Sequence, residues 1–177
     1  MTKTMTRLAA GAALAGLMAA PALAETKVIH AGHVLAEPGE GYLTRQTITV
    51  EDGKIVSVEA GYTRVPRGAE LIDLKDAYVL PGLIDSHVHI TGENGPNERI
   101  TAFEETDVDA AFDGAGFAYV TLLSGFTTVQ DVGASNSAIF GLRDAIAKGN
   151  VPGPRIRASG QAISVTGGHG DINGYSP

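Results

Sequence analysis

Two histidines separated by one residue, His87 and His89, are the residues of this 177-residue chain best suited to chemistry. They lie in the run LIDSHVHI, residues 83–90, which is apolar enough to predict a buried strand. Because side chains two positions apart on a strand point the same way, we expect Asp85, His87 and His89 to share one face. Neutral imidazole is a good ligand for Zn and similar ions. The pair therefore predicts a metal site, with two hydrogen-bonded histidines at a strand end as the alternative.

A third histidine, His169, is a candidate for contact with a substrate. It lies in TGGHGD, where the glycines before it let the backbone and ring approach a ligand closely. A solvated loop histidine is the alternative. Asp171 could orient His169 by a hydrogen bond, and Asp85 is expected to orient a metal ligand rather than to bind the ion itself. Asp131 ends another predicted strand, where it either faces the same site or makes a structural hydrogen bond.

The elements that position these residues alternate between strand and helix from residue 81 onward, a pattern typical of a parallel sheet covered by helices. Thr106 and Asp109 have the spacing of a capping box at a helix start. The predicted elements are a strand at 83–90, a helix from Thr106 to Leu123, a strand at 126–132, a helix at about 136–148 and a strand at 155–164.

An eight-unit barrel needs about 250 residues, or roughly 30 per unit, so residues 81–177 have room for about three βα units. We therefore predict an α/β fold in which these residues form the first, incomplete part of a (β/α)8 TIM barrel. A small α/β domain, complete as it stands, is the alternative.

Residues 25–80 have the pattern of short strands and predict a small β-sandwich segment. Asp52-Gly53 lies between the runs TITV and KIVSV, and this dipeptide favours a two-residue hairpin turn.

Residues 1–24 have the features of a cleavable signal peptide: Lys3 and Arg7, then an apolar run, then a small-residue cleavage site. Cleavage is expected between Ala24 and Glu25. The apolar run is well short of the about 20 residues of a membrane-spanning helix, which is the alternative. We therefore expect a periplasmic or secreted protein with no membrane attachment after cleavage.

The charge of the chain argues against a nucleic-acid partner. Its formal charge is -7, and loss of Lys3 and Arg7 with the leader makes it more acidic. An acidic chain has no basic stripe for nucleic acid or anionic lipid. Cysteine is absent, so no disulfide can form.

Four stretches together resemble the amidohydrolase superfamily, in its imidazolonepropionase-like and prolidase-like (Xaa-Pro dipeptidase-like) branch. They follow one another in the order found in that branch and cover about residues 27–171. The stretches are PGLIDSHVH, LLSGFTTVQDVG, GLRDAIAKGNVPGPRIRASGQAIS and VTGGHGD. Gln130 departs from the pattern, since many relatives carry a basic residue at this position.

The resemblance implies a hydrolase in which one or two divalent ions activate a water that attacks an amide carbonyl. His87 and His89 would be the first two metal ligands, and His169 would polarise the scissile carbonyl. Zn is the first candidate, with Mn, Fe and Co open. The substrate would be a small amide, dipeptide or cyclic amide, and we expect the full-length protein to be a homo-oligomer.

In that family, a bridging lysine, two further histidines and an aspartate come from later strands. None of these is expected within the 177 residues, so we expect them to form the N-terminal portion of the enzyme and to be inactive alone. A non-catalytic metal-binding or interaction module is the alternative.

Overall fold

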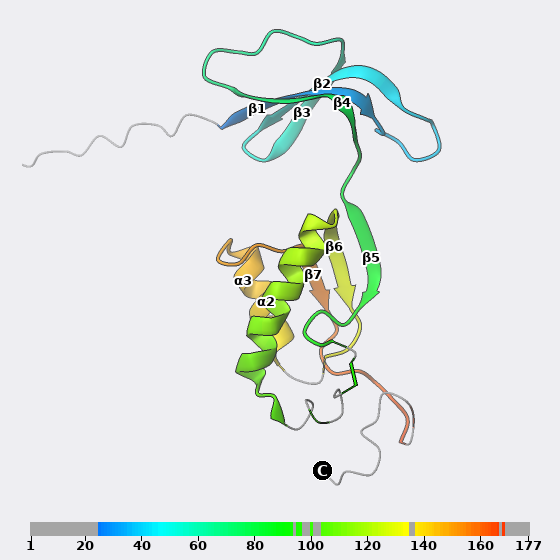
Figure 1. The fold of residues 1–177 in the computed structure, drawn as a ribbon, viewed down its shortest axis with the longest axis vertical. Helices are drawn as coiled ribbons and strands as arrows, with labels where there is room; N and C mark the ends of the chain where they lie inside the picture. The colour runs from blue at the N-terminus through cyan, green and yellow to red at the C-terminus, as the bar shows by residue number, and fades with distance from the viewer. Residues whose placement is uncertain are drawn as a thin grey trace, which may run out of the picture. The chain divides into compact units, whose positions relative to one another are not determined.

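The computed structural model describes residues 25–93, 95–96, 100, 104–134, 137–166 and 168. The chain divides into two compact units between Val79 and Leu80, and each unit has a sheet of its own (Figure 1). The predicted leader, residues 1–24, lies outside the described residues, and so do His169 and Asp171.

The first unit is built on a mixed four-stranded sheet in the order β3-β2-β1-β4. β1 pairs antiparallel with β2 and parallel with β4. The predicted hairpin between β2 and β3 is confirmed, because Asp52 (φ 48°) and Gly53 (φ 76°) both have the positive φ that a two-residue hairpin turn needs. The strands are β1 (Thr26–Val34), β2 (Leu43–Glu51), β3 (Lys54–Ala60) and β4 (Glu70–Val79). The described residues of this unit form one sheet, and the β-sandwich stays a prediction.

The second unit has a parallel three-stranded sheet in the order β5-β6-β7, and the chain passes through a helix between successive strands (Figure 1). The predicted alternation of strand and helix is therefore observed. The elements are β5 (Leu83–Val88), α2 (Asp107–Leu123), β6 (Phe126–Asp131), α3 (Ala138–Ala147) and β7 (Arg155–Ala158). Because the strands are parallel, their carboxyl ends meet at one edge of the sheet.

One apolar core holds both helices against the same face of this sheet. Val129 of β6 and Ile156 of β7 are buried together with Ala118 of α2 and with Ile139 and Leu142 of α3. Fully burying a side chain of this kind stabilises a fold by about 1.5–3 kcal/mol. The other face of the sheet is left for the polar residues described below.

Helix α2 begins where the sequence predicts. The Thr106 hydroxyl accepts a hydrogen bond from the Asp109 backbone N–H, and the Asp109 carboxylate accepts one from the Thr106 backbone N–H. This reciprocal pair satisfies two N–H groups that the first turn of a helix leaves without partners. The helix ends at Leu123, and Gly125 follows with a φ of 94°.

Two predictions about strands are wrong in part. The strand at 83–90 was expected to be buried, but Leu83 and Ile84 of β5 are 48% and 72% exposed. Among the described residues β5 pairs on one side only, with β6, so its outer edge has no covering element. The strand expected at 155–164 ends at Ala158, because Gly160 adopts a φ of 81° and turns the chain.

We expect Thr106→Ala to lower the free energy of unfolding of the second unit by about 1 kcal/mol, since the helix loses its cap. Thr106→Ser keeps a hydroxyl at the same place and should stay close to the original stability. Urea unfolding followed by circular dichroism measures both variants. Equal stability of the two would show that the capping box contributes nothing.

Candidate functional site

His87 and His89 lie together at the carboxyl end of β5. Their ring centroids are 5.5 Å apart, and the ring planes are inclined at 81°. With a Zn–N distance of about 2.0–2.1 Å, two imidazoles bound tetrahedrally to one ion have centroids roughly 5 Å apart. The spacing of the two rings therefore fits joint coordination of one divalent ion.

The ring of His89 is held by a hydrogen bond to the backbone of the loop that follows β6. Its Nδ1 lies 2.7 Å from the carbonyl oxygen of Gly133, just past β6. A carbonyl oxygen can only accept, so in this hydrogen bond Nδ1 is the donor and carries the proton. In a neutral ring the lone pair of Nε2 is then left for a metal ion, which is the common arrangement of histidine ligands.

Asp131, the last residue of β6, has a fully buried side chain. One carboxylate oxygen accepts from the Ile90 backbone N–H at 2.8 Å, and the other accepts from the Gly133 backbone N–H at 3.1 Å. Burial raises the pKa of the Asp131 carboxyl above its usual value, while these two N–H groups and the charge of His89 oppose that shift. Of the two roles open from the sequence, Asp131 therefore makes structural hydrogen bonds.

A β-bulge breaks the regular alternation of β5 just before the histidines. β5 advances three residues from Asp85 to Val88 while β6 advances two, from Val129 to Asp131. Two residues of one strand therefore oppose one residue of the other, which defines a bulge. The bulge brings Val88 to the helix-covered side of the sheet, where it packs against the core.

The predicted common face of Asp85, His87 and His89 is therefore wrong for Asp85. Asp85 is in register with the buried Val129, whereas its neighbours Ile84 and Ser86 line a hollow on the opposite face. The Asp85 carboxylate accepts a hydrogen bond from the backbone N–H of His87 at 3.0 Å. This contact is to the main chain inside the bulge and not to an imidazole.

In the described part of the chain, His87 and His89 are the candidate metal ligands that lie together. Within it, no group of three or more His, Cys, Asp or Glu side chains lies close enough to hold one ion. His169 and Asp171, predicted for the catalytic step, lie outside the described residues. Gly133 was missed as a site residue because its contribution is a backbone carbonyl. The signal available in the sequence was a glycine two residues after a strand-ending aspartate.

The polar face of the sheet has a hollow of about 430 Å³ beside the strands. Its lining comes from all three strands and consists of Ile84, Ser86, Thr128, Val129, Gln130, Arg155 and Arg157. This face lies opposite the helices.

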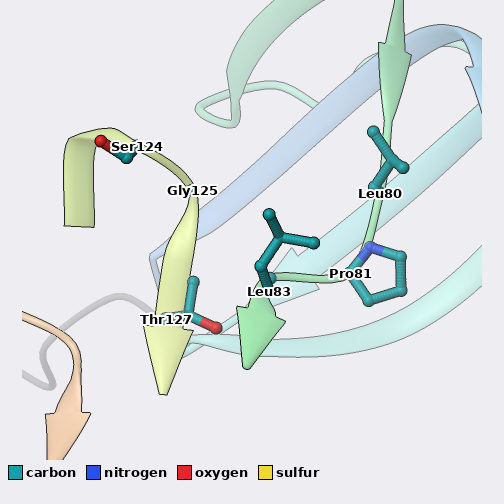
Figure 2. Close-up of a pocket in the computed structure, with 7 residues that line it drawn as sticks. Leu80, Pro81, Leu83, Ser124, Gly125 and Thr127 are labelled. Carbon is teal, nitrogen blue, oxygen red and sulfur yellow. The ribbon is translucent and has the colours of Figure 1, made fainter. Parts of the chain in front are cut away.

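A second hollow, of about 490 Å³, lies at the amino end of β5 and β6. Figure 2 shows the residues that line it. Its lining is Leu80, Pro81, Gly82, Leu83, Ser124, Gly125 and Thr127, with no titratable side chain. A Cβ on Gly82 would lie 2.0 Å from the Thr127 Oγ1, so the close approach of the two strands requires glycine there. This hollow lies at the opposite end of the strands from the histidines and is not a candidate for chemistry.

Comparison with known proteins finds relatives that are named as hydrolases. The chain is 29% identical to ochratoxinase from Aspergillus niger over 156 aligned residues. The alignment covers 84% of this chain and 31% of the relative. It is 35% identical over 122 residues to dihydroorotase from Pelotomaculum thermopropionicum, covering 68% of this chain and 27% of that enzyme. The chain thus spans about a third of the length of such relatives.

A solved structure of a Xaa-Pro dipeptidase with methionine bound in its active site is similar in fold. The TM-score is 0.76 at 36% sequence identity, over 86% of this chain and 37% of the dipeptidase. The sequence model of the amidohydrolase family matches residues 78–175, which include the whole parallel sheet and the histidine pair. The chain therefore belongs to the amidohydrolase family, and its structural neighbours are amidohydrolases of the Xaa-Pro dipeptidase and prolidase kind.

Proposed function

We propose that this chain is the N-terminal portion of an exported, metal-dependent hydrolase that cleaves amide, peptide or cyclic-amide C–N bonds. His87 and His89 are the first two ligands of one or two divalent ions, Zn being the first candidate. Family membership supports the hydrolase of C–N bonds. The metal, the export and the substrate are our proposals.

One observation carries the metal site: the hydrogen bond from His89 Nδ1 to the Gly133 carbonyl oxygen. In the neutral ring this bond leaves the lone pair on Nε2, and the neighbouring ring of His87 lies at the spacing that one ion would need. The remaining ligands would come from other parts of the complete protein.

A bound divalent ion lowers the pKa of a water towards neutrality and polarises a carbonyl. In this chain, His87 and His89 would hold the ion, and the Gly133 carbonyl oxygen, bonded to Nδ1, would fix the rotation of the His89 ring. His169 is proposed to donate a hydrogen bond to the scissile carbonyl, where negative charge develops during attack. Asp171 is proposed to orient His169.

The proposed fold of the complete protein is a (β/α)8 barrel joined to a β-sandwich. β5, β6 and β7 would be its first three strands, and the carboxyl edge that carries the histidines would be the mouth where such barrels place their active sites. The first unit would supply part of the sandwich.

The proposed substrate is a small amide such as an acyl amino acid or a dipeptide. The names of the related proteins include a Xaa-Pro dipeptidase, a prolidase and an ochratoxinase. Their resemblance to this chain supports an amide or peptide bond as the target, and the residues that select one substrate would lie on the later loops of the barrel.

We further propose export through the leader at residues 1–24, with Glu25 as the new N-terminus. Within the residues that the structure describes, none of the helices has the length and apolar character needed to cross a bilayer.

Replacing either metal ligand tests the metal site. In the complete gene product, His87→Asn and His89→Asn should each lower kcat/KM for a dipeptide or acyl amino acid by more than about 100-fold, because loss of a ligand costs more than loss of a supporting group. Bound Zn, measured by mass spectrometry of the metal content, should fall in parallel. A chelator should abolish activity, and added Zn should restore it.

His33→Asn is the matched control. His33 lies in β1 of the first unit, where its ring stacks on Tyr78 at 4.3 Å and takes no part in the proposed site. This variant should keep its metal and its activity. Full metal content in both His87 and His89 variants would contradict the proposed site, and stoichiometric metal without hydrolysis of any amide would favour a binding module.

Processing of the leader is tested by the mass of the exported protein. We expect the mature chain to begin at Glu25, and Ala24→Arg to block cleavage because signal peptidase accepts only small residues there. The change would leave the precursor at its full mass. A mature protein that still carries residues 1–24 would contradict the proposed export signal.

A further inference from the structure

Three groups at the carboxyl edge of the parallel sheet form a continuous chain of hydrogen bonds. The Asp131 carboxylate accepts from the Gly133 backbone N–H, and the Gly133 carbonyl accepts from Nδ1 of His89. The same carboxylate accepts from the backbone N–H of Ile90, the residue next to His89. The buried Asp131 side chain therefore holds two segments. One is the end of β5, which carries His89, and the other is the loop at Gly133, whose carbonyl oxygen bonds the His89 ring.

We propose that Asp131 is a positioning residue that sets the tautomer and the rotation of His89 without touching the ring. The carboxylate fixes where the Gly133 carbonyl oxygen lies, and that oxygen keeps the proton on Nδ1. The proposal rests on the proposed function in one respect only, since His89 is taken to be a metal ligand. The tautomer itself does not depend on whether a metal binds.

Burial is what makes this arrangement specific. The Asp131 side chain is fully buried, so water cannot replace either of its two backbone N–H partners. Loss of one of these hydrogen bonds would leave a carboxylate oxygen unpaired in the core. Both oxygens are used, one for each segment. An asparagine of the same shape offers one acceptor and one donor, so it can hold only one of the two segments.

Gly133 is a second point at which the arrangement can be tested. A Cβ built on it would lie 2.7 Å from the Ala162 Cβ and 3.5 Å from Cε1 of His89. The first distance is a clash, and the second is ordinary contact. Gly133→Ala should therefore displace the loop because of Ala162, and removal of the Ala162 methyl should relieve most of that clash.

The primary experiment is NMR of the imidazole nitrogens in the full-length, metal-free protein, at a pH where His89 is neutral. The expected spectrum places the proton of His89 on Nδ1. In Asp131→Asn, we expect a substantial fraction of the proton on Nε2, with no change at the ring of His87. Asp144→Asn changes an exposed carboxylate that pairs with Arg143, and it should leave both rings unchanged.

The second readout is the affinity for Zn²⁺ alone, measured by competition with a coloured chelator. Loss of a group that orients a ligand typically weakens metal binding about 10–100-fold, and we expect Asp131→Asn to lie in that range. Gly133→Ala should behave in the same way. Gly133→Ala combined with Ala162→Gly should recover most of the affinity, and Ala162→Gly alone should have none of these effects.

The outcomes separate the two proposals. A His89 proton on Nε2 in the unaltered protein, or a tautomer that stays unchanged in both Asp131→Asn and Gly133→Ala, would overturn the positioning role. If Asp131→Asn does not fold, the Gly133→Ala pair decides by itself. A protein that shows the expected tautomers but binds no Zn²⁺ would retain the positioning role for Asp131 and remove the proposed metal function.

Discussion

The second unit depends on one buried carboxylate. Asp131 has no exposed surface, and both of its oxygens accept from backbone N–H groups on separate segments, at Ile90 and at Gly133. A buried carboxylate without partners would be strongly destabilising, so these two bonds are a condition of its presence in the core. The same bonds join the end of β5 to the loop after β6. The edge of the sheet that carries the histidines is thereby held by a buried carboxylate that would be costly to leave unpaired.

The bulge in β5 reconciles two demands that a regular strand could not meet. Val88 has to reach the core under the helices, although Ile84 and Ser86, four and two residues before it, line the opposite face. One extra residue between Asp85 and Val88 reverses the alternation and makes this possible. The Asp85 carboxylate, bonded to the His87 N–H, satisfies a backbone donor inside the bulge. Bulges of this kind occur near active sites because they redirect side chains.

Much of the fold could be predicted because its signals are local. The capping box of Thr106 and Asp109 and the hairpin at Asp52-Gly53 each involve residues within one turn of chain, and both were predicted at the right positions. The histidine pair was singled out from its spacing and its place at a strand end, and its role as a metal site stays a prediction. Asp85 was assigned to the wrong face, because a bulge is set by the register with β6 and not by β5 itself.

The contribution of Gly133 could not be predicted for a related reason. Its role depends on a carbonyl oxygen that lies 44 residues from His89 along the chain and becomes its neighbour only when β5 and β6 pair. The exposure of β5 has a similar origin. The apolar residues Leu83 and Ile84 indicate a strand, but they do not show whether another element covers that strand. Patterns within one element predict that element, whereas contacts between elements require the register.

The position of the histidines also constrains the kind of site they can form. β5 pairs with β6 on one side, and among the described residues its other edge has no partner. In the proposed barrel that free edge is where the first strand would meet the last, so His87 and His89 would lie beside the seam that closes the sheet. Two imidazoles alone bind an ion weakly, since a Zn site normally needs three or four protein ligands. Closing the sheet would therefore bring in the missing ligands and pair the free edge of β5 in the same step, which couples completion of the fold to completion of the site.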